Sequence, residues 1–322
     1  MCFLLLGFVG FRFFLYLCTG FKTTETMILF MNRMKPTLLL LLACMSVFVC
    51  HGKKRPNLLS ERIGVCTSIS HGQSVKDAGG HHLEMSLADF TACSKPDDSA
   101  FEANRNAAQG CVLPIVSSNG FFPGGVHVTG PKADHAAALL VAETALRRAH
   151  EVGITTCVLG SSGARQIPDG FSREEAESQF VELLKKLGPI AKKYGITIAI
   201  EPLRRQECNF INTVHEGYMI AKRVKHPNIR VNADIYHMLQ EGEGPESIRE
   251  AGRKYLRHVH VAENARRTAP GVDGDDFTPY LQALKDIDYR GVISIECGWE
   301  NLDNQVSSAI GELKRQLKSI GF

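Results

Sequence analysis

Strand-type and helix-type segments alternate along the chain from residue 62 onward. Short runs rich in β-branched and other apolar residues predict strands, and the longer stretches between the later ones place apolar residues at helical spacing. The predicted strands span 62–69, 82–90, 111–118, 155–162, 196–203, 229–236, 256–263 and 291–298. Eight β-then-α units over about 260 residues favour an α/β fold, the (β/α)8 or TIM barrel, as a single domain.

Helix boundaries support this order. The segment from Asp134 to Val152 has an acidic first turn and stops before a glycine, and Ser172 is placed to cap a second helix that ends at Gly195. Further helices are predicted at 214–224, 245–254, 277–286 and 305–320. A doubly wound sheet is the alternative fold, but Ser68 to Gly72, after the first strand, lacks the GxGxxG turn expected there.

The first fifty residues differ from the rest and predict a leader ahead of a barrel domain at 60–322. Two apolar runs, 3–21 and 38–50, flank a short polar stretch. The second run follows Arg33 and Lys35, which is the order of charged and apolar regions in a secretory signal peptide. We therefore expect an exported, periplasmic protein.

Within the second run, LLAC resembles a bacterial lipoprotein cleavage box, which would lipidate Cys44 and tether the protein to a membrane. Two alternatives stay open. In the first, the run 3–21 is an uncleaved membrane anchor. In the second, the leader is an artefact of the gene model, because Met27, Met31 and Met34 each offer a later start. In the last case the protein is cytoplasmic.

The charge balance argues against nucleic-acid binding, and the cysteine pattern argues against disulfide-stabilised and zinc-thiolate proteins. Of 37 basic and 34 acidic residues, four basic and one acidic lie before position 51, so the predicted barrel is neutral. Nucleic-acid binders usually carry a basic excess, and none is predicted as a partner. The six cysteines after position 51 are scattered without a CxxC pair, which argues against a disulfide framework and a thiolate zinc site.

Polar residues stand at the ends of four consecutive predicted strands. They are Glu201, Asp234, His260 and Glu296, and His237 follows Asp234 by one turn of the predicted loop. Because the carboxyl ends of barrel strands meet at one mouth, we expect the four to converge. Carboxylate oxygens with one imidazole suit one divalent ion, Mn²⁺, Co²⁺ or Mg²⁺, better than a closed tetrahedral zinc site.

The segments EPLRRQE, NADIYHM, HVHVAENARR, PGVDGDDF and ISIECGW resemble the sugar isomerase/epimerase superfamily with xylose-isomerase-like barrels, nearest to the ketohexose 3-epimerases of the D-tagatose or D-psicose type. The resemblance covers about residues 60–320. It implies that the four strand-end residues bind the metal and that a small sugar is the substrate. It also implies that His237 and Arg266 hold the carbonyl and hydroxyl oxygens of the substrate, with Glu207 near its end.

Epimerisation beside a ketone needs an acid and a base on opposite faces of the substrate, and Glu201 and Glu296 are the candidates for these catalytic roles. Three other functions stay open: a metal-dependent lyase or dehydratase acting on 3-keto-glycosides, an abasic-site endonuclease, and a non-catalytic exported carbohydrate-binding barrel. The endonuclease needs a DxH pair where this chain has Asp273-Gly-Asp275, and its neutral charge opposes that role. Assembly into a homo-oligomer also stays open.

Overall fold

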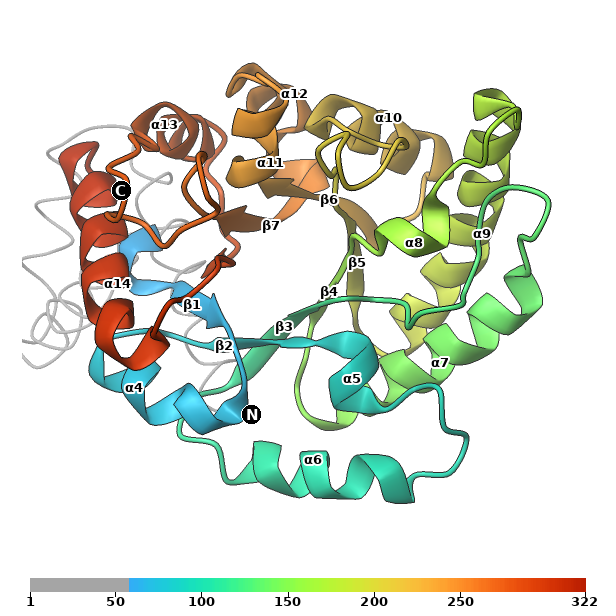
Figure 1. The fold of residues 1–322 in the computed structure, drawn as a ribbon, viewed down its shortest axis with the longest axis horizontal. Helices are drawn as coiled ribbons and strands as arrows, with labels where there is room; N and C mark the ends of the chain where they lie inside the picture. The colour runs from blue at the N-terminus through green and yellow to red at the C-terminus, as the bar shows by residue number, and fades with distance from the viewer. Residues whose placement is uncertain (1–57) are drawn as a thin grey trace, which may run out of the picture. The chain divides into compact units, whose positions relative to one another are not determined.

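The computed structural model describes residues 58–322, which form a closed barrel of eight parallel strands surrounded by helices (Figure 1). Each strand pairs with the next in the chain, and β8 returns to pair with β1. The strands are β1 Ile63–Cys66, β2 Leu83–Ser86, β3 Ile115–Asn119, β4 Thr156–Leu159, β5 Thr197–Ile200, β6 Ile229–Asp234, β7 Leu256–Val261 and β8 Ile293–Ile295. The predicted (β/α)8 barrel is confirmed.

The helices lie on the outside of the strands, as Figure 1 shows. The longer ones are α6 Ser99–Gln109, α7 His135–Glu151, α9 Arg173–Lys193, α10 Val214–Val224, α12 Glu246–Tyr255, α13 Thr278–Asp286 and α14 Leu302–Ser319. The shorter ones are η1 Leu59–Glu61, η2 Ile69–His71, α4 Gly72–Asp77, α5 Leu87–Thr91, α8 Ser162–Arg165 and α11 Ile235–Gln240.

Most strands end earlier than predicted, and in β2 and β6 the reason is a helix that begins directly after the strand, inside the predicted segment. β2 stops at Ser86, and α5 follows at once, burying Leu87 and Phe90 at helical spacing. β6 stops at Asp234, whose carboxylate accepts from backbone amides of the next turn and so starts α11. His237 therefore lies on a short helix, not in the loop predicted for it.

Two of the predicted helix boundaries illustrate how capping sets them. Ser172 accepts from the backbone nitrogen of Glu175, as expected for the cap of α9. α14 begins at Leu302, three residues before the predicted start, because Asn301 accepts from the backbone nitrogen of Asn304. The apolar spacing alone did not locate this helix start, whereas Asn301, as a capping residue, marks it in the sequence.

The seam that closes the barrel depends on one glycine. His82 lies fully buried and contacts Ser294 of β8, with 3.0 Å between Nε2 and Oγ. A Cβ at Gly64 of β1 would lie 2.3 Å from the His82 ring. Only a residue without a side chain lets the imidazole cross β1 to reach β8.

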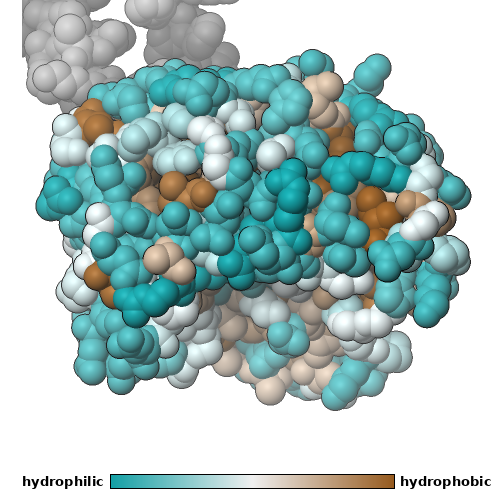
Figure 2. Space-filling model, turned by 45° about the horizontal axis from the view of Figure 1, so that its top comes forward, coloured by the Kyte–Doolittle hydropathy of each residue, from teal (hydrophilic) through white to brown (hydrophobic). Residues whose placement is uncertain are grey.

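The outer face is mostly hydrophilic, with apolar residues recessed between polar ones in the view of Figure 2. Among residues 58–322, no helix is long and apolar enough to cross a membrane. The six cysteines of this part of the chain are free, as the sequence predicts. The predicted leader, with the lipidation site at Cys44, lies outside the described residues.

Candidate active site and metal centre

The four predicted metal ligands converge at the carboxyl end of the barrel. Ligand atoms of Glu201, Asp234, His260 and Glu296 all lie within 4.8 Å of one another. Glu201 and Glu296 directly follow β5 and β8, whereas Asp234 ends β6 and His260 lies in β7. Since these strands are neighbours in the order β5-β6-β7-β8, the two glutamates flank the other two ligands.

Asp234 presents one carboxylate oxygen without a donor. Its Oδ1 accepts from the backbone nitrogen of Tyr236 at 2.8 Å, whereas Oδ2 is buried and has no hydrogen-bond partner among residues 58–322. Burial raises the pKa of Asp234, although His237 and Arg267 act in the opposite direction. A buried oxygen left without a donor is costly in a folded protein, and a bound cation removes that cost.

Glu201 is held in place through one of its two carboxylate oxygens. Oε1 lies 2.8 Å from Nδ1 of His260 and accepts from Asn232 at 2.8 Å. Oε2 lies against Gly160, where an added Cβ would be 2.2 Å away. A glycine after β4 thus makes room for the carboxylate. No described residue donates to Oε2.

Glu296 lies on the other side of the site and is also anchored. Oε2 lies 3.0 Å from Nδ1 of His260 and 3.0 Å from Nη2 of Arg267. Oε1 accepts from Asn119 at 2.6 Å. Burial alone would raise the pKa of Glu296, but His260 and Arg267 lower it to about 2. Glu296 is therefore ionised at neutral pH.

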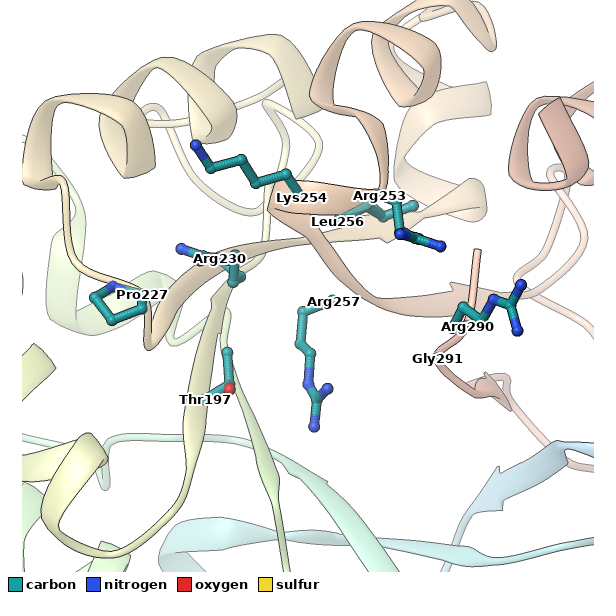
Figure 3. Close-up of a pocket in the computed structure, with 9 residues that line it drawn as sticks. All are labelled: Thr197, Pro227, Arg230, Arg253, Lys254, Leu256, Arg257, Arg290 and Gly291. Carbon is teal, nitrogen blue, oxygen red and sulfur yellow. The ribbon is translucent and has the colours of Figure 1, made fainter. Parts of the chain in front are cut away.

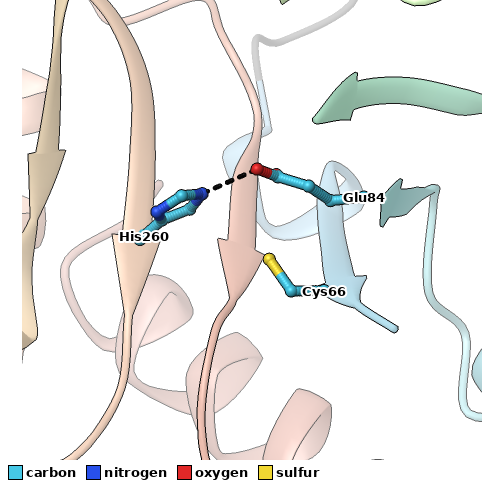
Figure 4. Close-up of side chains that lie close together, drawn as sticks. All are labelled: Cys66, Glu84 and His260. Atoms are coloured by element: carbon cyan, nitrogen blue, oxygen red, sulfur yellow. Dashed lines mark hydrogen bonds and ion pairs between the residues drawn. The ribbon is translucent and has the colours of Figure 1, made fainter. Parts of the chain in front are cut away.

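A buried carboxylate that the sequence analysis did not single out orients His260. Glu84 of β2 accepts from Nε2 of His260 at 2.9 Å (Figure 4), from Nε2 of His258 at 2.8 Å and from Ser117 at 2.7 Å. Burial opposes ionisation, yet the two histidines hold the pKa of Glu84 well below its usual value. An ionised carboxylate only accepts hydrogen bonds, so both Nε2 atoms must donate.

Nδ1 of His260 therefore faces the carboxylates of Glu201 and Glu296. Burial lowers the pKa of His260, but Glu296 and Glu84 raise it well above the usual value. In the metal-free protein a proton on Nδ1 sits between the carboxylates. If a metal ion replaced this proton, Nδ1 would be a ligand whose ring is already oriented by Glu84. A carboxylate that accepts from the second nitrogen of a histidine ligand is common in metal sites. The signal in the sequence was a charged residue inside the apolar run of β2.

His237 points its second nitrogen into the same site. Nδ1 accepts from the backbone nitrogen of Arg204 at 3.2 Å, so Nε2 carries the proton. Nε2 lies 3.6 Å from Oδ2 of Asp234 and has no hydrogen-bond partner among the described residues. Burial lowers the pKa of His237, which favours the neutral imidazole. A neutral ring can donate to an oxygen of a bound ligand.

Of two adjacent arginines, the structure brings the second to the site. Arg266 has an exposed side chain that pairs with Asp273 in the same loop. Arg267 lies 3.0 Å from Glu296, and 3.7 Å from both Asp234 and Glu207. Its φ of 54° places it in the left-handed region. Arg266, expected to hold substrate, thus lies apart from the ligands, and the pattern RR alone could not tell which side chain turns inward.

Glu207 lies at the edge of the site, where the sequence predicts contact with the far end of a substrate. Its carboxylate accepts from Nε of Arg204 at 2.8 Å and is half-buried. A buried carboxylate, Glu263, shapes the opposite loop by accepting from the backbone nitrogens of Gly271 and Gly274. The loop that carries both Arg267 and Asp273 is therefore folded around Glu263.

The residues present fit a divalent cation. Three carboxylates and one imidazole nitrogen offer hard ligands, and Oδ2 of Asp234 accepts no hydrogen bond from any residue of the described barrel. The nearest fixed positive charge, Arg267, leaves an excess of negative charge among the buried acids. Like charges so close together need a compensating cation.

Comparison with known families identifies the fold family. The family model described as the xylose isomerase-like TIM barrel matches residues 60–319. The chain belongs to this family. The resemblance predicted from the strand-end motifs is thereby confirmed, and the four strand-end residues that the motifs supply lie together at the site described above.

Curated relatives of the chain are sugar epimerases and isomerases. An L-ribulose 3-epimerase of Methylomonas sp. is 31% identical over 52% of this chain and 61% of its own length. A D-psicose 3-epimerase of Ruminiclostridium cellulolyticum is 35% identical over 36% of this chain and 39% of its own length. An inosose isomerase of Bacillus subtilis is 31% identical over 38% of this chain and 48% of its own length. The match thus spans less than two thirds of each of these relatives.

Solved structures share the fold at lower identity. A D-allulose 3-epimerase from Methylomonas sp. superposes with a TM-score of 0.67 at 23% identity, covering 79% of this chain and 96% of that one. A 3-keto-D-glucoside 4-epimerase from E. coli superposes with a TM-score of 0.66 at 19% identity, covering 79% and 98%. At these identities the likeness concerns the barrel alone.

Proposed function

We propose that the chain is a metal-dependent epimerase or isomerase of a keto-sugar, which moves a proton on a carbon beside a carbonyl group. The observation that carries this proposal is the placement of Glu201 and Glu296 on either side of Asp234 and His260, each with one carboxylate oxygen turned away from His260. The names of the curated relatives, which act on ribulose, psicose and inosose, support the substrate class.

Each glutamate has a role in proton transfer. One carboxylate removes the proton from the substrate carbon, and the other returns a proton to the opposite face. A divalent ion, Mn²⁺, Co²⁺ or Mg²⁺, bound by the four ligands supplies Lewis acidity to the substrate oxygens. The free oxygen of Glu201, beside Gly160, and Oε1 of Glu296, beside Asn119, are the atoms placed to exchange protons.

Three further side chains hold the substrate. His237 donates through Nε2 to a substrate oxygen, because its other nitrogen is occupied by the backbone of Arg204. Arg267 places a fixed positive charge near the oxygen on which negative charge develops. Glu207 accepts from hydroxyl groups farther from the reacting carbon. We assign to Arg267 the role that the motif gave to Arg266.

A deuterium-exchange screen tests the proposal. The chain is stripped with EDTA, reloaded with Mn²⁺ and incubated in D₂O with a panel of ketoses and 3-keto-glycosides, followed by NMR. We expect deuterium at the carbon beside the carbonyl together with an epimer or isomer. Release of a leaving group would identify a lyase instead, and exchange that persists undiminished after stripping would contradict the metal-dependent mechanism.

Export rests on the leader alone and is tested separately. We propose that the mature chain begins between about Cys44 and Lys53 and lies outside the cytoplasm. Mass spectrometry of the mature N-terminus, with labelling by a palmitate analogue, distinguishes a lipoprotein from soluble cargo. An uncleaved chain recovered from the cytosol would contradict export.

A further inference from the structure

A basic pocket lies at the opposite end of the barrel from the metal ligands. It has a volume of about 240 Å³ and forms where β5, β6, β7 and β8 begin (Figure 3). Five of its lining side chains are cationic, and none of its lining residues is acidic. They are Arg230, Arg253, Lys254, Arg257 and Arg290, together with Thr197, Pro227, Leu256 and Gly291.

Three of the five cations are not neutralised by an acid. Arg253 and Arg290 share the carboxylate of Asp288, at 2.5 and 2.8 Å. Arg230, Arg257 and Lys254 form no ion pair with any residue of the described barrel. The pocket therefore keeps a net positive charge of several units, which attracts anions.

Neutral oxygens fix the direction of the guanidinium groups of Arg257 and Arg230. Arg257 donates through Nε to Oγ1 of Thr156 at 2.9 Å, and Figure 3 shows its side chain extending into the space between Thr197 and Arg290. Arg230 donates to the carbonyl oxygens of His226 and Ile229, at 2.9 and 2.7 Å. These contacts hold the groups in place without cancelling their charge.

Burial makes this arrangement costly without an anion. Arg230 and Arg257 are only partly exposed, and burial lowers the pKa of Arg230, with Tyr255 opposing and Arg257 adding to that effect. Half-buried cations that line one pocket are destabilised by mutual repulsion and lost hydration. An anion with several oxygens would compensate both, and guanidinium groups match phosphate geometry closely.

We propose that this pocket binds a phosphate-type oxyanion, either as a free small ion or as the headgroup of an anionic lipid. Its volume is below the range of pockets for drug-sized ligands, which favours a phosphate or pyrophosphate group over a sugar. Both sources present the same phosphate oxygens to the guanidinium groups, and basic pockets bind the headgroups of anionic lipids in other proteins. The site is independent of the function proposed for the carboxyl end.

Two lysines provide a matched pair of variants. Lys254 in the pocket lies over the ring of Tyr255, and Lys222 outside it lies over Tyr218, at 5.6 and 5.3 Å from the ring centroids. The two tyrosine rings contact each other, and both lysines are exposed and lack an acidic partner among residues 58–322. Lys254→Gln and Lys222→Gln therefore remove the same charge from similar surroundings.

Isothermal titration of the full-length chain with phosphate and pyrophosphate, against chloride at equal ionic strength, tests the proposal. We expect saturable binding that weakens about tenfold or more in Lys254→Gln and Arg230→Gln, and by less than about twofold in Lys222→Gln. Because Arg230 also donates to backbone carbonyl oxygens, Arg230→Gln is compared only if its midpoint of thermal unfolding equals that of the wild type. If it does not, the comparison of Lys254→Gln with Lys222→Gln decides the outcome. No saturable binding, or equal weakening in both lysine variants, would overturn the proposal.

Vesicle flotation then identifies the source of the anion. Vesicles that contain phosphatidylglycerol are compared with vesicles of phosphatidylcholine alone. Extra binding to the anionic vesicles that Lys254→Gln abolishes and Lys222→Gln retains supports a lipid headgroup. Extra binding that is absent, or that both lysine variants retain, assigns the pocket to a free anion, provided that the titration shows saturable binding.

Discussion

The two ends of the barrel carry opposite charge on the same strands. On β7, Arg257 lies near the amino end, and three residues or about 10 Å farther along the strand His260 faces the carboxylates of Glu201 and Glu296. On β6, Arg230 at the amino end is matched by Asp234 at the carboxyl end. The acids converge on one largely buried space, whereas the cations line a pocket at the surface. Strand direction therefore decides what a charged residue at a strand end can do.

The ends also differ in how their polar groups are held. At the carboxyl end, charged groups hold one another: Glu84 orients His260, and Arg267 contacts Glu296. At the amino end, the central arginines are held by a hydroxyl group and by backbone carbonyls. The first arrangement prepares a centre with excess negative charge for a cation. The second leaves positive charge for an anion.

The largest effect that separates the ends is expected in turnover. Glu201→Gln and Glu296→Gln keep the shape of the side chain but remove a proton-carrying oxygen, so turnover should fall by about 10²-fold or more. Arg230→Gln, at the opposite end, should leave turnover within about twofold. Rates of epimer formation on a substrate from the exchange screen measure this. Near-normal turnover in both glutamate variants would leave only a metal-bearing binding barrel.

The next effect concerns metal affinity and Glu84. Glu84→Gln keeps a carbonyl acceptor but loses the charge that orients His260, so affinity for Mn²⁺ should fall by about 10- to 100-fold. Ser117→Ala removes one neutral donor to the same carboxylate and should have a smaller effect. Calorimetry measures both, and the ¹⁵N shifts of His260 in the metal-free protein report its protonation. An unchanged affinity and unchanged shifts in Glu84→Gln would contradict the role of Glu84.

The smallest effect distinguishes two adjacent side chains. Arg267→Gln should lower kcat/KM by about tenfold or more, because the side chain contacts Glu296 inside the site. Arg266→Gln should change it by less than about twofold, because that side chain is exposed and pairs with Asp273. Steady-state kinetics of both variants, checked for equal thermal stability, provide the comparison. The reverse order of effects would restore the assignment made from the motif.

The sequence predicted the barrel and the convergence of the ligands because both follow from strand order. Apolar runs located all eight strands, and strand ends located Glu201, Asp234, His260 and Glu296. What it could not predict depends on side-chain direction and on contacts across the barrel. Glu84 lies about 175 residues from the histidines that it contacts, and its role appears only when β2 and β7 face each other across the lumen.

Local backbone geometry accounts for the other differences. Arg266 and Arg267 are neighbours of the same type, and the left-handed φ of Arg267 directs one inward and the other to Asp273. His237 is on a helix because the carboxylate of Asp234 caps that helix as well as facing the site. Neither feature leaves a mark in hydrophobic periodicity. The basic pocket was hidden for another reason, since the cations that form it are balanced by acids elsewhere in a neutral barrel.

The central claim is that the carboxyl end binds one divalent ion where a proton otherwise sits on His260. Calorimetric titration of the EDTA-treated chain with Mn²⁺ at several pH values tests it most directly. Because the pKa of His260 is raised in the metal-free protein, binding must displace a proton from Nδ1. Glu296, whose pKa is lowered to about 2, is already ionised and contributes no pH dependence near neutrality.

We therefore predict one ion per chain and the release of a proton on binding. Affinity should rise by up to about tenfold per pH unit until His260 is deprotonated without metal, and then level off. Asp234→Asn should bind far more weakly while its thermal unfolding stays cooperative. A chain that binds no divalent ion, or binds it with the same affinity in Asp234→Asn, would contradict the account.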